Sequence, residues 1–180
     1  LDICKYGPFH PLLWNSFCCV PIVTAQVASR LRLDWCGRPG QVSETAGTFQ
    51  FILYAVTFSW VIDRILAMII FGTFIEDDER YDYYARLDEY IWLYYVKNFL
   101  SLMYYVCSVI FLCKIRKSVR EKYAIPEHKN CPSGVEDFCC AAACSCCAVA
   151  QLARHTADYD TYRGVCCSET GLPSHVPAIV

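Results

Sequence analysis

Two long hydrophobic runs dominate the pattern of polar and apolar positions along the chain. The first, residues 48–75, contains one charged pair near its middle, and the second, residues 91–113, contains one lysine near its start. At about 1.5 Å rise per residue, a helix of either length crosses a hydrocarbon core of roughly 30 Å. The pattern therefore predicts two transmembrane helices that form a hairpin.

Charged residues are distributed unevenly around this predicted hairpin. The connection, residues 76–90, is acidic and rich in tyrosine. Basic residues flank the outer ends of the two runs: Arg30, Arg32 and Arg38 before the first, and Lys114, Arg116, Lys117, Arg120 and Lys122 after the second. Because such residues concentrate on the side from which a protein inserts, both termini are predicted on the cytosolic, matrix or stromal side. The choice between an organelle and the plasma membrane stays open.

Shorter helices are predicted on both sides of the hairpin. One lies within residues 23–33 and stops at the turn sequence DWCGRPG, and another follows the second hydrophobic run and stops before Pro126. A third, residues 135–156, is apolar and alanine-rich but too short to cross the bilayer. We therefore expect an all-α membrane protein, a transmembrane helical hairpin with shorter cysteine-rich helices packed at one leaflet.

The chain divides into four predicted segments. They are an N-terminal cysteine-motif segment (1–40), the hairpin with its acidic loop 76–90 (41–113), a basic linker with a second cysteine-rich motif (114–158), and an irregular tail rich in glycine and proline (159–180).

One charged pair, Asp63 and Arg64, interrupts the first hydrophobic run near its centre. A charged residue at the middle of a membrane helix costs about 2.5–3.5 kcal/mol on insertion scales. The pair is therefore expected to face protein and to serve either as an interhelix contact or as part of an ion path.

Net charge and histidine placement exclude several classes of protein. The net charge of −2 gives no electrostatic footprint for nucleic acid. The four histidines lie in different segments, and the sequence has no metalloprotease helix pattern and no glycine-rich phosphate loop. We expect neither a nucleic-acid-binding protein nor an enzyme.

Cysteine is the most unusual part of the composition, with 14 in 180 residues. Such a density indicates disulfides in a short secreted protein, but the hydrophobic runs and basic flanks favour a membrane protein with cysteines facing a reducing compartment. Thiols, or thiolates on a metal ion, are therefore expected over disulfides. The alternative is that cysteine acts as a small apolar residue at helix contacts.

The cysteines of residues 135–156 suggest a metal site. On one continuous helix, Cys140, Cys144 and Cys147 share a face, and Cys18 or Cys19 from the other half of the chain would complete the set of ligands. Thiolates prefer soft metal ions, so zinc, or cadmium in its place, is the expected ion.

The two cysteine-containing segments also resemble each other. Residues 19–28 align with residues 144–153 without a gap, with Cys, Ala, Gln and Ala in the same positions. If both are helices, Gln26 and Gln151 would bind each other's amide groups where lipid offers no partner. The alternative is chance similarity between two alanine-rich helices.

Three stretches resemble the placenta-specific-eight family, the cysteine-rich membrane proteins that include the plant cadmium-resistance and cell-number-regulator proteins. Residues 18–31, CCVPIVTAQVASRL, look like its first cysteine motif, and residues 116–126, RKSVREKYAIP, look like its Arg-x-x-x-Arg-x-x-Tyr-x-Ile linker. Residues 137–154, which contain CSCCAVAQLAR, look like its second motif. Order and spacing agree over residues 14–36 and 114–156.

Some positions depart from the family pattern. Ile22 stands where the family commonly has cysteine after Pro21, and Ala150 and Leu152 replace the usual cysteine and glutamate around Gln151. The two hydrophobic runs and the acidic loop form a longer insertion between the motifs than is usual in the family.

Two functions follow as hypotheses. The resemblance implies a homo-oligomer that transports or buffers divalent metal, zinc or cadmium, with Asp63 near any conduction path. The alternative is a non-catalytic accessory subunit of a larger organellar complex, photosynthetic or respiratory, contacted through the acidic loop and the tail. The expected partners are the lipid bilayer and either further copies of the chain or other subunits.

Overall fold

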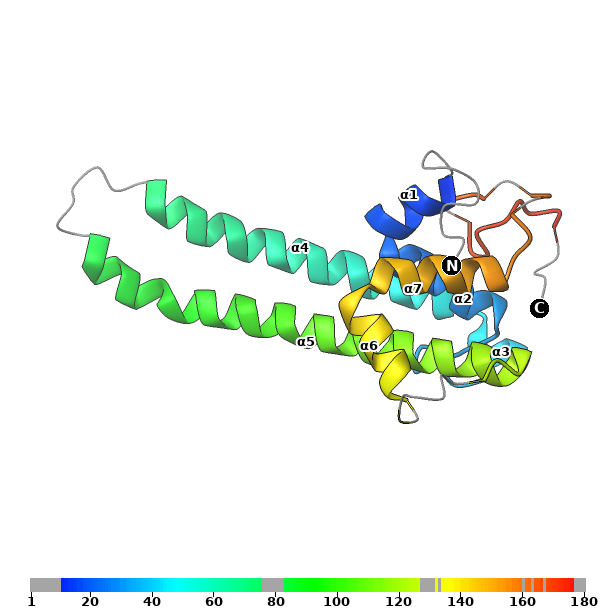
Figure 1. Cartoon of the computed structure of the whole chain (residues 1–180). Coiled ribbons are helices and arrows are strands. Elements are labelled where there is room, and N and C mark those ends of the chain that lie inside the picture. Colours follow the sequence, from blue (N-terminus) through cyan, green and yellow to red (C-terminus); the bar gives the residue numbers. More distant parts are fainter. Residues whose placement is uncertain are drawn as a thin grey trace. The chain divides into compact units, whose positions relative to one another are not determined.

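The protein is helical in the part that a computed structural model describes, which comprises residues 11–75, 83–126, 132, 134–159, 161–162, 164–166 and 168–176. Figure 1 shows the helices in chain order: α1 (Pro11–Cys18), α2 (Val20–Arg30), α3 (Val42–Thr45), α4 (Thr48–Ile75), α5 (Tyr83–Tyr123), α6 (Val135–Ala143) and α7 (Ser145–His155). The predicted all-α fold class is confirmed, and α4 and α5 are the two helices long and apolar enough to cross a membrane.

The chain forms two compact units. The first, here called the cysteine unit, contains Leu1–Tyr54 and Ser108–Val180, and the second, the hairpin unit, contains Ala55–Cys107. The segments long and apolar enough to cross a membrane are Thr48–Ile70 in α4 and Ile91–Tyr123 in α5. That the shorter helices pack at one leaflet stays a prediction.

Helix α5 is longer than the sequence pattern predicted. It begins at Tyr83, inside the segment expected to be an acidic loop, and runs for 41 residues through the basic linker. The helix predicted for the linker is present, but it is the last part of α5 and not a separate helix, because no glycine or proline interrupts residues 83–123. The helix ends where Ala124 adopts a left-handed backbone with φ of 50° and Pro126 follows. Residues 76–82 lie outside the described part.

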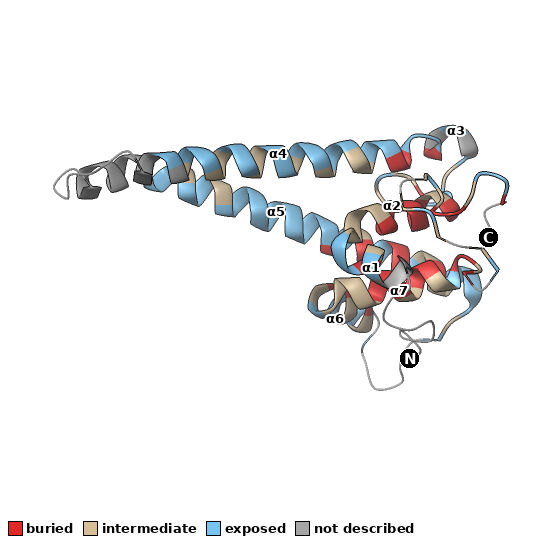
Figure 2. Ribbon diagram, turned by 90° about the horizontal axis from the view of Figure 1, so that it is seen from above, coloured by how far each residue is buried: buried red, intermediate tan, exposed pale blue. Residues whose placement is uncertain are grey.

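The hydrophobic core of the cysteine unit forms where α2, α7 and the last turns of α5 meet. Figure 2 shows buried residues concentrated on these helices, in contrast to the largely exposed surface of the hairpin unit. Small residues allow the helices to approach closely, and the fully buried members include Val27, Ala28, Ile115, Val149 and Ala153. The tail is irregular, as predicted, yet it adds the buried Leu172 and Val176 to this core.

The predicted single helix over residues 135–156 is wrong. Cys144 has a non-helical backbone, φ −146° and ψ 70°, and α6 and α7 meet there at a bend of 113°. The backbone hydrogen bonds of both helices nevertheless extend to Cys144. Its N–H donates to the Cys140 carbonyl of α6, and its own carbonyl accepts from the Ala148 N–H of α7. The Ser145 hydroxyl donates to the Ala141 carbonyl over 2.6 Å and so occupies an acceptor that the bend leaves free.

Candidate metal centre

Three cysteines come together at the bend between α6 and α7. The Sγ atoms of Cys144, Cys146 and Cys147 all lie within 4.8 Å of one another, and all three residues are half-buried. Zinc bound tetrahedrally at about 2.3 Å from each sulfur holds its sulfurs about 3.8 Å apart. The Cys144 and Cys146 sulfurs are 3.6 Å apart, so this pair has the spacing of two thiolates on one zinc ion.

Two members of the cluster are joined by a disulfide, Cys144 with Cys147, whose Cα atoms are 5.4 Å apart. The expectation of thiols over disulfides is therefore wrong for this pair. Because the ligand of zinc is the thiolate, metal binding by all three cysteines requires the disulfide to be reduced first.

The other predicted ligands lie elsewhere. Cys140 is on α6, and the bend at Cys144 removes it from the shared helix face that a single helix would have provided. Cys18 is exposed at the end of α1, and Cys19 is half-buried directly before α2. Among the described residues, the cluster of mutually close ligand atoms contains none of these three. It contains Cys146 instead. Sequence reasoning missed this residue because no glycine or proline marks the helix break at Cys144.

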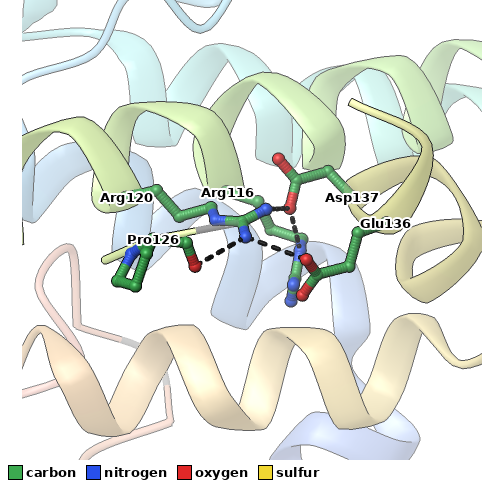
Figure 3. A network of polar contacts seen from close by, with 5 residues as sticks. All are labelled: Arg116, Arg120, Pro126, Glu136 and Asp137. Carbon is green, nitrogen blue, oxygen red and sulfur yellow. Dashed lines mark hydrogen bonds and ion pairs between the residues drawn. The ribbon is translucent and has the colours of Figure 1, made fainter. Parts of the chain in front are cut away.

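A buried ionic network fixes α6 to α5 (Figure 3). The Asp137 carboxylate accepts from Arg116 Nε over 3.0 Å and from Arg120 over 2.9 Å, and Glu136 accepts from the same Arg120 over 2.9 Å. Arg120 also donates to the Pro126 carbonyl over 3.1 Å. The two acidic residues lie in the first turn of α6, where they also compensate the helix dipole.

This network gives a physical role to the linker motif. Arg116 and Arg120 are four residues apart and so lie on one face of α5. Both point toward the start of α6, as Figure 3 shows. The pattern Arg-x-x-x-Arg followed by an acidic pair was the sequence signal that could have predicted these contacts.

Arg30 holds the other end of the cluster-bearing segment. It is 1% exposed and donates to the Ala153 carbonyl over 3.2 Å, to Thr156 Oγ1 over 3.1 Å, to Tyr159 Oη over 2.6 Å and to the Thr170 carbonyl. Ala153 is in the last turn of α7, where carbonyls lack helical partners and a cation is favourable. One guanidinium thus connects α2, the end of α7 and the tail.

The predicted contact between Gln26 and Gln151 is replaced by another. Gln26 is buried, and its amide nitrogen lies 2.6 Å from the Cys166 carbonyl, 3.0 Å from that of Ser168 and 3.3 Å from that of Val165. Its two N–H groups are therefore occupied by the tail, while Gln151 is half-buried on α7. The repeat places both residues on helices, but the tail takes the position expected for a partner helix.

In the hairpin unit, Asp63 connects the two helices. One oxygen of its carboxylate lies 3.0 Å from Lys97 Nζ of α5, and the other lies 2.6 Å from a guanidinium nitrogen of Arg64. The Ser101 hydroxyl lies 3.5 Å from the first oxygen. Sequence reasoning missed Lys97 as the partner, because only the register of the two helices brings it opposite Asp63.

Comparison with protein-family models gives a match to the model described as PLAC8 family, over residues 2–155. That range contains both cysteine motifs, the linker and the whole hairpin. Comparison with curated proteins and with solved structures gives no match.

Proposed function

Because the chain belongs to the PLAC8 family, we propose that it is a non-catalytic membrane protein that binds a soft divalent metal ion, zinc or cadmium, through Cys144, Cys146 and Cys147. The observation that carries this proposal is the meeting of three Sγ atoms within 4.8 Å at the bend between α6 and α7. Three thiolates and an open fourth position would bind zinc while allowing it to exchange, which buffering or transport requires.

The contacts around the cluster support this function. Arg116 and Arg120 hold the first turn of α6, and Arg30 holds the last turn of α7. The helices on either side of the cluster are thus anchored at the ends remote from the bend, and anchored supports keep metal ligands at fixed spacing.

Metal analysis of the detergent-purified protein, with and without prior reduction, tests the proposal. Reduced wild type should contain stoichiometric zinc after exposure to it, and the oxidised protein should contain much less. A variant with serine at all three cluster cysteines should lose the metal, whereas the matched controls Cys107→Ser and Cys139→Ser, both at exposed positions outside the cluster, should retain it. Metal retained by the triple variant would refute the assignment of the ligands.

We further propose that the protein self-associates and transports the metal ion that it binds. A homo-oligomer that moves metal should show metal-dependent flux in liposomes and a mass in detergent that corresponds to several chains. A protein without metal and without flux, co-purifying at fixed stoichiometry with other chains, would instead be the accessory subunit that the sequence offers as the alternative.

A further inference from the structure

The charges in the middle of the hairpin unit do not cancel. Asp63 supplies one negative charge, and both Arg64 and Lys97 are paired with it. One oxygen of its carboxylate accepts from Arg64, and the other contacts Lys97 and Ser101. Within the described part of the chain, no other acceptor contacts either cation. The group therefore carries one uncompensated positive charge.

Arg64 lies on the exposed face of α4. Its side chain is 54% exposed, whereas that of Asp63, which contacts α5, is 24% exposed. The residues one helical turn away on the same face, Trp60, Val61 and Met68, are 62%, 39% and 72% exposed. The guanidinium has five N–H donors, and Asp63 accepts from one of its nitrogens. Donors left without acceptors in lipid are costly.

The depth of Arg64 keeps it away from lipid headgroups. It lies near the middle of the apolar run of α4, with about 16 Å of helix between it and Ile75 and about 24 Å between it and Thr48. When this run is centred on a hydrocarbon core of roughly 30 Å, about 11 Å of hydrocarbon separates the Arg64 backbone from the nearer headgroups. This distance is longer than an arginine side chain, so the missing acceptor has to come from protein within the membrane.

We propose that the face of α4 around Arg64 is the docking surface for a membrane helix of a different protein, which carries an aspartate or glutamate near its middle. Such a carboxylate accepts two N–H groups of the guanidinium at once and cancels the excess charge. The exposed Trp60, Val61 and Met68 supply the apolar contacts on either side of this ion pair.

Charge also decides against a second copy of this chain on the same face. A second copy would bring the same excess of positive charge, and like charges repel strongly in a medium of low dielectric constant. Self-association therefore uses another surface. The proposal is also independent of the metal centre, which belongs to the cysteine unit.

Binding of a synthetic membrane helix tests the proposal, with the full chain in phosphatidylcholine vesicles. The helix is a leucine- and alanine-rich peptide with one aspartate at its centre, and the comparison peptide has asparagine there. Energy transfer between labels should show that wild type binds the aspartate peptide about 5–30 times more tightly, the range typical of polar contacts between model membrane helices. Arg64→Gln should abolish this preference. The control Lys117→Gln, at a 74%-exposed position outside the hairpin unit, should retain it.

A reversal of charge separates a specific contact from a loss of folding. Arg64→Glu should prefer a peptide with a central lysine, which a misfolded variant would not do. A photo-crosslinker at Met68 should react with the aspartate peptide, whereas one at Phe58, which is 68% exposed on another side of α4, should not.

Three results would overturn the proposal. The first is equal binding of the aspartate and asparagine peptides, or a preference for aspartate that Arg64→Gln retains. The second is a smaller oligomer in Arg64→Gln with unaltered peptide binding, which would indicate a second copy as the partner. The third is displacement of the aspartate peptide by phosphatidylglycerol, which would indicate that Arg64 binds a lipid headgroup.

Discussion

Replacing Asp137 with asparagine should destabilise the cysteine unit more than any other change in its ionic network. The Asp137 side chain is 7% exposed, and its partners Arg116 and Arg120 are 10% and 11% exposed. Asparagine keeps the size of the side chain but removes the charge, so Arg116 remains buried without its carboxylate. Breaking a buried ion pair in this way costs about 3–5 kcal/mol.

Two other substitutions, one within the network and one at an exposed ion pair outside it, give smaller losses of stability to compare with that of Asp137→Asn. Glu136→Gln leaves Arg120 paired with Asp137, and Glu136 is 28% exposed, so a cost of about 1 kcal/mol is expected. Glu121→Gln breaks only the pair with Lys117, whose side chains are 69% and 74% exposed. A pair of this kind contributes about 0.3–0.5 kcal/mol.

The assay is denaturant unfolding of the three variants in one detergent, followed by a signal from the cysteine unit, with hydrogen exchange of the α6 amides as a local measurement. The expected order of destabilisation is Asp137→Asn, then Glu136→Gln, then Glu121→Gln. In Asp137→Asn, the α6 amides should also lose protection first. Equal stability of Asp137→Asn and Glu121→Gln would refute the reasoning that burial makes this network strong.

Three further predictions concern the core and the tail of the cysteine unit. Gly171→Ala should cost about 1–3 kcal/mol, because φ is +68° and a Cβ would lie 2.6 Å from Arg30 and 2.7 Å from Gln26, whereas Gly47→Ala in the same unit, with nothing within 4 Å, should cause no loss in the same unfolding assay. Ile115→Ala should cost about 2–5 kcal/mol because Ile115 is fully buried, and Ile110→Ala at a 49%-exposed position should cost far less; equal costs would place Ile115 outside the core. Arg30→Gln should release the tail, seen as faster limited proteolysis of residues 164–176 while α4 stays intact, and an unchanged cleavage rate would show that the hydrogen bonds of Arg30 do not hold the tail.

Some features of the protein were predictable because they depend on local sequence. The two long apolar runs predicted α4 and α5, since crossing a bilayer requires only length and hydrophobicity. The order of the cysteine motifs and the linker predicted the family. The length of α5 was underestimated, because the acidic and basic ends of the helix look like boundaries in a charge pattern but contain no residue that stops a helix.

The position of the cysteine cluster depended on tertiary contacts. The bend at Cys144 brings Cys146 to Cys144 and Cys147 and leaves Cys140 on another helix. No local signal marks that bend, and the segments on either side of it are held by Arg116, Arg120 and Arg30, which come from distant parts of the chain.

The sequence by itself determined that this chain is an all-helical protein of the PLAC8 family with a membrane-crossing hairpin and an irregular tail. Only the tertiary structure decided which polar groups meet: Asp137 with two arginines of α5, Gln26 with the tail, and Asp63 with Lys97. The physical reason is the distance along the chain over which each kind of interaction acts. Hydrophobicity and helix propensity act over a few neighbouring residues, whereas a buried charge or amide must find its partner wherever packing brings one within about 3 Å.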